Sequence, residues 1–314
     1  MDNGKISVPV VIGMDAGGTK TKVEIADLTG STLAVFTGDG MNVNSFSEAE
    51  CEAHLAAMLQ EAMDHLESRA QIRSVSVGIA GISNPKTQAF LKRGIRSFGL
   101  EFDPLVMGDQ EAALYGAHGG ADGIILIAGT GSIAYGMRGE NGLPRFARSG
   151  GWGHLIDDEG SGYAIGRDVL SMVVRAEDHR IPATCLREAV FERLGIACVK
   201  ELISFVYSPS TGKKEIAALA PLIMMAYEKG EPAAAAVLDK AADELSKNVL
   251  SVAQQLELAN PSLCLFGGVL TKNAVLREKL EQRLAEKLPG LTVKEPMFDA
   301  VHGAVIAALQ HAAE

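Results

Sequence analysis

The chain of 314 residues lacks several features that mark particular classes of protein. No stretch approaches the roughly 18 uninterrupted apolar residues of a membrane-spanning helix, and residues 1–6 form neither the basic nor the apolar part of a secretory signal. The four cysteines lie far apart, without a Cys-x-x-Cys pair. We therefore expect a cytoplasmic protein with reduced thiols, no membrane partner and no zinc or iron–sulfur site.

An excess of basic residues is also lacking, because 29 Lys and Arg stand against 39 Asp and Glu, for a net charge of −10. This balance argues against nucleic acid as a partner. A small anionic ligand stays possible, since backbone amides in glycine-rich loops bind phosphate without basic side chains. Glycine is plentiful, at 34 residues, and many glycines follow directly on apolar, β-branched runs.

Strand-like and helix-like segments alternate along the first half of the chain, which predicts an α/β fold. An apolar run over residues 8–14 leads into Asp-Ala-Gly-Gly-Thr, after which residues 20–26 alternate polar and apolar at a period of two. Residues 123–127 and 133–137 repeat this strand-turn-strand pattern around Ala-Gly-Thr-Gly-Ser. The repetition predicts an internal duplication into two domains, with a boundary near residues 117–119.

The remaining segments fit the same class. Helical periodicity covers residues 48–69, and a buried strand follows at 74–79. A short strand at 105–107 precedes a helix at 110–118, and the mainly helical second half has one further strand at 263–266. Helices are expected there over residues 167–176, 184–194, 213–228, 232–256, 272–288 and 302–313.

The first hairpin shares its glycines with a phosphate-binding P-loop but differs in context. A P-loop needs Gly-Lys-Ser/Thr followed by a helix, whereas Thr19 stands in place of that lysine and a strand follows. One interpretation is a β-hairpin whose glycine amides and Thr19 hydroxyl face phosphate oxygens, while Asp15 faces Mg²⁺ through water. The other is a tight Gly-Gly turn in which Asp15 serves only the turn.

A second loop of the same composition, at residues 128–132, adds weight to the ligand interpretation. A strained turn with threonine between glycines is costly to use twice without a ligand, and two such loops suit the two ends of a polyphosphate. A third strand ends at Gly267 and Gly268, where the backbone could approach a flat ring such as adenine. Together these turns predict nucleotide binding.

Asp109 follows a buried strand and precedes a helix, which is where α/β proteins place residues that face a ligand. Aspartate is also a preferred helix N-cap, so capping explains this residue equally well. The sequence leaves both interpretations open.

The only tryptophan, Trp152, lies in a glycine-rich loop over residues 149–162 that also holds three acidic residues. The loop is too polar for a core strand and too rich in glycine for a helix. An aromatic face beside carboxylates suits a polyhydroxylated ligand, and the alternative is a surface loop with a structural tryptophan. His154, in the same loop, is expected to be structural.

The order of these motifs resembles that of a known family. The set comprises Asp-Ala-Gly-Gly-Thr-Lys at 15–20, Gly108-Asp109, Ala-Gly-Thr-Gly-Ser at 128–132, Gly-Gly-Trp-Gly-His at 150–154 with Asp-Glu-Gly-Ser at 158–161, and Phe-Gly-Gly at 266–268. It resembles the N-acetylglucosamine kinase and glucosamine kinase branch of the BadF/BadG/BcrA/BcrD ATPase family, within the sugar kinase, Hsp70 and actin superfamily. The resemblance spans nearly the whole chain, and its most specific part is the string around Trp152.

The resemblance implies two RNase H-like (actin-like ATPase) domains flanking a nucleotide cleft, over residues 1–117 and 118–314. The final helix, at about 300–314, is expected to pack back on the first domain. The implied activity is an ATP-dependent kinase for the 6-hydroxyl of N-acetylglucosamine or glucosamine, with Mg²⁺ as cofactor, the amino sugar as small-molecule partner and a homodimer as the assembly.

The resemblance also implies roles for individual residues. Asp109 is implied as the general base and a sugar contact, and Asp15 is implied at the Mg²⁺ ion. Nucleotide contacts are expected at Gly17, Gly18, Thr19, Lys20, Gly129, Thr130, Gly131, Ala218, Gly267, Gly268 and Lys272. Sugar contacts are expected at Ser132, Gly151, Trp152, Gly153, Asp158 and one asparagine. Asn44 is favoured as that asparagine by its spacing from Gly40 and Phe46, and Asn42 is the alternative.

Three other functions share parts of this pattern. ROK sugar kinases carry a cysteine-rich zinc motif, and this sequence has no such spacing. BadF-type activators drive electrons from an iron–sulfur cluster and need closely placed cysteines. A chaperone-like ATP switch of the actin and Hsp70 kind needs no sugar pocket, and it leaves the loop around Trp152 unexplained.

Overall fold

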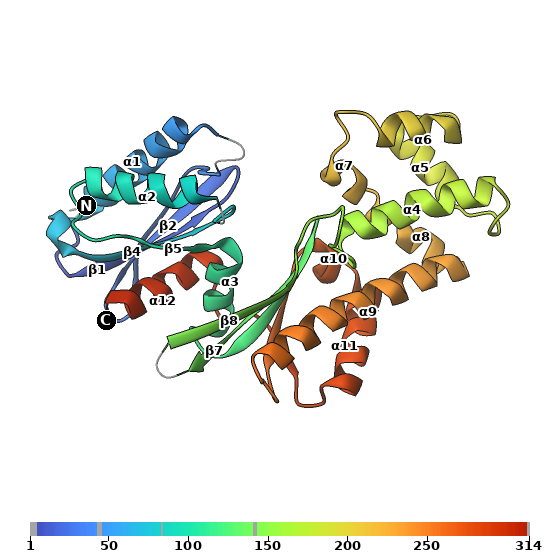
Figure 1. Ribbon diagram of the computed structural model, residues 1–314. Coiled ribbons are helices and arrows are strands. Elements are labelled where there is room, and N and C mark those ends of the chain that lie inside the picture. The colour runs from blue at the N-terminus through green and yellow to red at the C-terminus, as the bar shows by residue number, and fades with distance from the viewer. Residues whose placement is uncertain (1–4, 43–45, 83, 141–142, 313–314) are drawn as a thin grey trace. The chain divides into compact units, whose positions relative to one another are not determined.

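The computed structural model describes residues 5–42, 46–82, 84–140 and 143–312. The chain divides into two compact units (Figure 1). Met1–Asp122 and Glu295–Glu314 form unit 1, and Gly123–Lys294 forms unit 2. Unit 1 thus runs a few residues past the boundary expected near 117–119, and it also takes the C-terminal segment.

The sheet of unit 1 has the strand order β3-β2-β1-β4-β5. Its strands are β1 (Val10–Ala16), β2 (Lys20–Asp27), β3 (Thr32–Asp39), β4 (Ile72–Ile79) and β5 (Leu105–Gly108). The first three strands pair antiparallel, and β4 and β5 join β1 in parallel. The carboxyl ends of β1 and β5 therefore meet at one edge of the sheet, where Asp15 and Asp109 lie.

Helices cover both faces of this sheet (Figure 1). They are α1 (Glu48–His65) and α2 (Pro85–Ser97) on one face, and α3 (Asp109–His118) and α12 (Ala300–Ala312) on the other; a short 3-10 helix, Arg69–Gln71, precedes β4. Successive side chains of β1 point to opposite faces of the sheet, so the strand contributes to the packing of the helices on both faces. Ile12 and Met14 belong to the core under α1 and α2, whereas Val11 packs with Val305 of α12.

Glycines allow α12 to approach both the sheet and α3. A Cβ atom on Gly13 would lie 2.6 Å from the backbone nitrogen of Val305. A Cβ atom on Gly303 would lie 2.0 Å from the carbonyl oxygen of Ala112. Only glycine fits at such short separations, and the close packing brings Asp299, just before α12, to the first sheet, where it pairs with Lys22.

The sheet of unit 2 repeats the order of the first, as β8-β7-β6-β9-β10. Its strands are β6 (Gly123–Ala128), β7 (Ser132–Glu140), β8 (Leu143–Gly150), β9 (Ser262–Phe266) and β10 (Thr292–Lys294). Again three antiparallel strands lead into two parallel ones. The shared topology confirms the predicted α/β class and agrees with a duplicated domain.

The helices of unit 2 form two groups (Figure 1). The helices are α4 (Gly162–Glu177), α5 (Leu186–Leu194), α6 (Val199–Val206), α7 (Lys213–Ala217), α8 (Ile223–Glu228), α9 (Pro232–Gln255), α10 (Gly268–Thr271) and α11 (Ala274–Lys287). The long α9 packs on the sheet and against α11, whereas α5 to α8 gather around α4. Within the described ranges, no helix combines the length and apolar character that a membrane span requires.

Several of the expected helices have other bounds in the structure, and two of these differences have a clear physical cause. The segment 213–228 is not one helix, because a 3-10 turn, Ala220–Leu222, separates α7 from α8; Pro221 has no N–H for a continuous helix. The segment 272–288 begins later than expected, since Asn273 caps α11 by accepting the Leu276 N–H at 3.0 Å. Strands β3, β8 and β10 and helix α6 were not expected at all.

Candidate active site

The first glycine-rich turn joins β1 to β2. The Gly17 N–H donates to the carbonyl oxygen of Lys20, with an N···O distance of 3.0 Å that closes the turn. Gly18, Thr19 and Lys20 are exposed at its tip, and Asp15, near the end of β1, is half-buried. The polar atoms of this tip are therefore open to a ligand.

The segment that follows β3 lies against this turn. A Cβ atom on Gly40 would lie 2.9 Å from the carbonyl oxygen of Gly17, and the Met41 N–H donates to that oxygen at 3.3 Å. Asn42 comes next and is half-buried. Asn44, the favoured sugar contact, lies outside the described residues.

Acidic side chains gather around Asp15. Burial raises the pKa of the Asp15 carboxyl above its ordinary value of 3.8, and the negative charges of Asp109 and Asp299 raise this pKa further. Lys22 and Lys20 act in the opposite direction, and the Lys22 Nζ lies 2.6 Å from the Asp299 Oδ2. Because the three carboxylates repel one another, a bound cation would stabilise their ionised forms.

Asp109 is the first residue of α3 and is exposed. The N-cap position is held by Gly108, which makes no side-chain cap. The Asp109 carboxylate accepts the N–H of Gln110 at 3.0 Å. It accepts no other hydrogen bond from the described residues, and its exposure leaves it accessible to a small molecule.

The second glycine-rich turn, between β6 and β7, is held by the start of α4. The carbonyl oxygen of Gly129 accepts the Gly162 N–H at 2.7 Å, and that of Thr130 accepts the Tyr163 N–H at 3.2 Å. A Cβ atom on Gly131 would lie 2.9 Å from the Asp158 Oδ2. Glycine at this turn therefore lets the Asp158 carboxylate lie directly against the hairpin.

The loop with Trp152 is hydrogen-bonded to the same hairpin. The Ser132 hydroxyl donates to the carbonyl oxygen of Glu159 at 2.8 Å. Asp158 is only 4% exposed, and its φ of +65° is unusual for a residue other than glycine. Strained residues of this kind cluster at functional sites. Trp152 itself is 63% exposed, so its ring is not part of the core.

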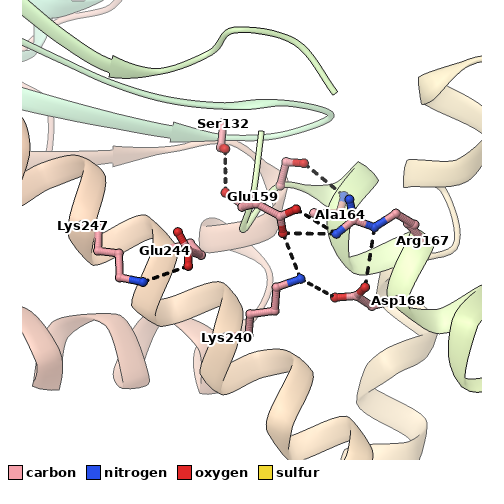
Figure 2. A network of polar contacts seen from close by, with 9 residues as sticks. Ser132, Glu159, Ala164, Arg167, Asp168, Lys240, Glu244 and Lys247 are labelled. Carbon is pink, nitrogen blue, oxygen red and sulfur yellow. Dashed lines mark hydrogen bonds and ion pairs between the residues drawn. The ribbon is translucent and has the colours of Figure 1, made fainter. Parts of the chain in front are cut away.

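Glu159 anchors the loop to two helices (Figure 2). Arg167 of α4 donates to both Glu159 carboxylate oxygens at 2.9 and 3.2 Å, and the Lys240 Nζ of α9 lies 3.1 Å from one of them. Asp168 contacts the same two cations. Burial alone would raise the pKa of Glu159, but the two cations outweigh burial and hold this pKa below its ordinary value of 4.5.

A cavity of about 600 Å³ opens beside the second turn, wholly within unit 2. Five residues expected to contact the nucleotide line it: Gly129, Thr130, Ala218, Gly268 and Lys272. Gly267 does not line the cavity, but a Cβ atom there would lie 2.2 Å from the carbonyl oxygen of Ala128, so its backbone fixes the cavity wall. Small and apolar side chains make up most of the lining, as in pockets for organic ligands.

Two polar residues of the cavity, Lys214 and Asn273, were missed by the sequence analysis. Lys214 stands at the start of α7, and nothing in its local sequence sets it apart from other lysines. Within the described part of the chain, neither Lys214 nor Lys272 forms an ion pair with a carboxylate. Two such cations at one cavity favour an anionic ligand.

The expected site residues thus fall into two sets. In unit 1, Asp15, the turn at 17–20 and Asp109 share one edge of the sheet. In unit 2, the turn at 129–131 joins the cavity to the loop over 151–158.

We predict that Glu159→Gln lowers the free energy of unfolding at pH 7 by about 0.5–2 kcal/mol, because it removes a half-buried carboxylate between two cations. The folded pKa of Glu159 lies below the unfolded one, so this stabilisation is complete above about pH 5.5 and declines as the pH falls below 4.5. Urea unfolding of the wild type and of Glu159→Gln between pH 7 and pH 4 measures the difference in the free energy of unfolding.

The matched control is Glu244→Gln, which removes one of the two carboxylate partners of the exposed Lys247 on α9 (Figure 2). Its effect should stay within about 0.5 kcal/mol. A Glu159→Gln protein as stable as the wild type at pH 7, or a difference independent of pH, would contradict the anchoring role.

Comparison with known proteins identifies a family and several relatives of this chain. The family described as the BadF/BadG/BcrA/BcrD ATPase family matches residues 12–310. An N-acetylmuramic acid/N-acetylglucosamine kinase from Clostridium acetobutylicum is 35% identical over 302 residues, covering 95% of this chain and 97% of the relative. An N-acetyl-D-glucosamine kinase from Dictyostelium discoideum is 30% identical, covering 97% of this chain and 99% of the relative.

A solved structure extends the likeness to three dimensions. The crystal structure of a candidate N-acetylglucosamine kinase from Chromobacterium violaceum has a TM-score of 0.69 at 26% identity, and the match covers 96% of this chain and 99% of the other. The sequence prediction of the family and the fold is confirmed. The chain belongs to the BadF/BadG/BcrA/BcrD ATPase family.

Proposed function

We propose that this protein is an ATP-dependent amino-sugar kinase that transfers the γ-phosphate of ATP to the 6-hydroxyl of N-acetylglucosamine or glucosamine. The observation that carries this proposal is the β6–β7 hairpin of unit 2. Gly129 and Thr130 line the cavity, whereas Gly131 and Ser132 contact the loop that presents Trp152. One turn therefore serves a pocket of nucleotide size and a loop suited to a polyol, which is what phosphoryl transfer to a sugar requires.

The cavity suits the nucleotide. Its apolar lining, with Ile165 and Met224, fits a purine ring, and the charges of Lys214 and Lys272 fit the phosphates of a nucleotide. The amides of Thr130 and Gly131 can supply further donors for phosphate oxygens, whereas the Gly129 N–H donates to the carbonyl oxygen of Gly131 at 2.9 Å within the turn. The exposed turn at 17–20 of unit 1 is proposed as a phosphate contact in its own right.

Asp15 is the proposed Mg²⁺ residue. Among the described residues, no group of three or more His, Cys, Asp or Glu side chains is placed to hold a metal ion alone. This fits Mg²⁺, which binds through one or two carboxylates together with substrate phosphates and water. The carboxylates near Asp15 that raise its pKa give the acidic surroundings such a cation needs. When bound, Mg²⁺ neutralises the charge that develops on the transferred phosphoryl group.

Asp109 is the proposed general base. Its carboxylate is exposed at the end of β5 and can accept the proton of the sugar hydroxyl as that oxygen attacks the γ-phosphate. Asp158 and the face of Trp152 are the proposed sugar contacts, together with Gly151, Gly153 and Ser132. The relatives at 35% and 30% identity are named for N-acetylated sugars, which favours N-acetylglucosamine over glucosamine as the substrate.

We predict that MgATP turnover by the purified protein depends on an amino sugar. ADP release would be measured with N-acetylglucosamine, glucosamine, glucose and no sugar, and N-acetylglucosamine should give the highest rate. Trp152→Ala should lose the part of the ADP release that depends on sugar, because the substitution removes the ring from the proposed sugar site. Tyr207→Ala, which removes an aromatic ring 82% exposed after α6, is the control and should keep it. Equal ADP release with and without every sugar would point to an activator or an ATP switch.

We predict that Asp109→Asn lowers kcat on the order of 10²–10⁴-fold, the usual share of general-base catalysis. The melting temperature and the KM for ATP should stay nearly unchanged, because the asparagine oxygen still accepts the Gln110 N–H. Steady-state kinetics and thermal melting test both statements.

Glu111→Gln, in the same first turn of α3, is the matched control and should keep near-normal kcat. A folded Asp109→Asn protein with the kcat of the wild type would refute the catalytic role.

A further inference from the structure

Arg148 lies on β8, two residues before the turn that leads to Trp152. Its guanidinium carbon is 4.0 Å from the centre of the Trp152 ring. One guanidinium nitrogen, Nη2, donates to the carbonyl oxygens of Gly150 at 3.2 Å and Gly151 at 3.1 Å. A single side chain thus contacts three successive residues of the loop.

The turn that Arg148 contacts has an unusual backbone. Gly150 and Gly151 have φ values of +80° and +72°, so two successive residues are in the left-handed region. This places both carbonyl oxygens within reach of the same nitrogen. Glycine is flexible in the absence of such contacts, so the two hydrogen bonds select this shape of the turn.

The strand beneath the guanidinium is itself fixed. The carbonyl oxygen of Arg148 accepts from the Gln255 side chain of α9 at 3.2 Å, and the Ser149 hydroxyl donates to Asn248 of the same helix at 2.8 Å. Arg148 therefore extends from a rigid base, as a residue that positions a loop must.

The arrangement has an energetic cost that packing alone does not explain. The Arg148 Nε is buried and has no hydrogen-bond partner among the described residues. Leaving a buried donor unsatisfied is unfavourable, and each such group in a folded protein calls for a reason. A shorter or apolar side chain would avoid this cost but would lose the contacts to the turn and the ring.

We propose that Arg148 is a positioning residue that holds the Trp152 ring and the 150–151 turn in the shape that receives the sugar. The proposal rests on the proposed function, because it takes Trp152 as a sugar contact. Holding the ring before the sugar binds removes rotational freedom that binding would otherwise have to restrict. Lysine cannot substitute, since its ammonium group lacks the planar guanidinium face that stacks on the indole while a terminal nitrogen of the same group donates to the two carbonyl oxygens.

The experiment uses Trp152 as its own reporter, because it is the only tryptophan in the chain. Arg148→Lys and Arg148→Ala are compared with the wild type by tryptophan emission, acrylamide quenching and steady-state kinetics. Arg145→Lys is the matched control. Arg145 lies on the same strand and donates to the carbonyl oxygen of Gln255 at 2.9 Å; among the described residues, it forms no hydrogen bond, ion pair or ring contact with Trp152 or the turn.

In both Arg148 variants we expect acrylamide quenching to increase, because one face of the indole is uncovered. The kcat/KM for the sugar should fall by about 10- to 100-fold, mainly through KM, while the KM for ATP stays within about twofold. A role confined to stability would lower the melting temperature without this split between the two substrates. Arg145→Lys should behave as the wild type in every measurement.

Unchanged quenching together with an unchanged sugar KM in Arg148→Lys would overturn the proposal, and so would equal losses for both substrates. Failure of the proposed function looks different. In that case the wild type itself shows no sugar-dependent turnover, and the quenching comparison alone decides whether Arg148 holds the Trp152 ring.

Discussion

The packing of the 158–162 segment against the β6–β7 hairpin is the constraint on which the rest of unit 2 depends. Gly131 lets the Asp158 carboxylate approach the turn. The N–H groups at the start of α4 donate to the carbonyl oxygens of Gly129 and Thr130. The cavity and the loop with Trp152 therefore share one piece of backbone. A change in this contact would alter both, which couples the geometry of the cavity proposed for the nucleotide to that of the loop proposed for the sugar.

The two units use the same topology for different tasks. Each sheet begins with a β-hairpin whose two strands are connected by a glycine-rich turn. In each sheet, two later strands then add in parallel to the first strand of the hairpin. In unit 1 the parallel strands bring carboxylates to the turn, so that Asp15 and Asp109 interact electrostatically. In unit 2 the corresponding space beside the turn is a cavity with two lysines. Unit 1 thus carries the carboxylates proposed for a cation and a base, and unit 2 carries the two cavity lysines proposed for phosphate.

The sequence predicted the parts of the fold that local patterns encode. The strand-like runs around two turns of glycine and threonine identified both hairpins, and the order of the motifs identified the family. The edge strand β3 was not predicted, because Leu33 and Val35 are exposed and the strand lacks the apolar pattern of a buried one. Asp299 and Arg148 could not be found in this way. Asp299 reaches Asp15 only because α12 packs back on β1, and Arg148 acts on backbone carbonyls that any residue carries. The roles of the named site residues remain predictions.

Phosphorus NMR of a reaction that contains the protein, MgATP and N-acetylglucosamine tests the central claim most directly. We predict a new phosphate-ester resonance that is coupled to the two protons on carbon 6 of the sugar and that grows in step with ADP. Release of inorganic phosphate alone, or an ester on another hydroxyl, would contradict it.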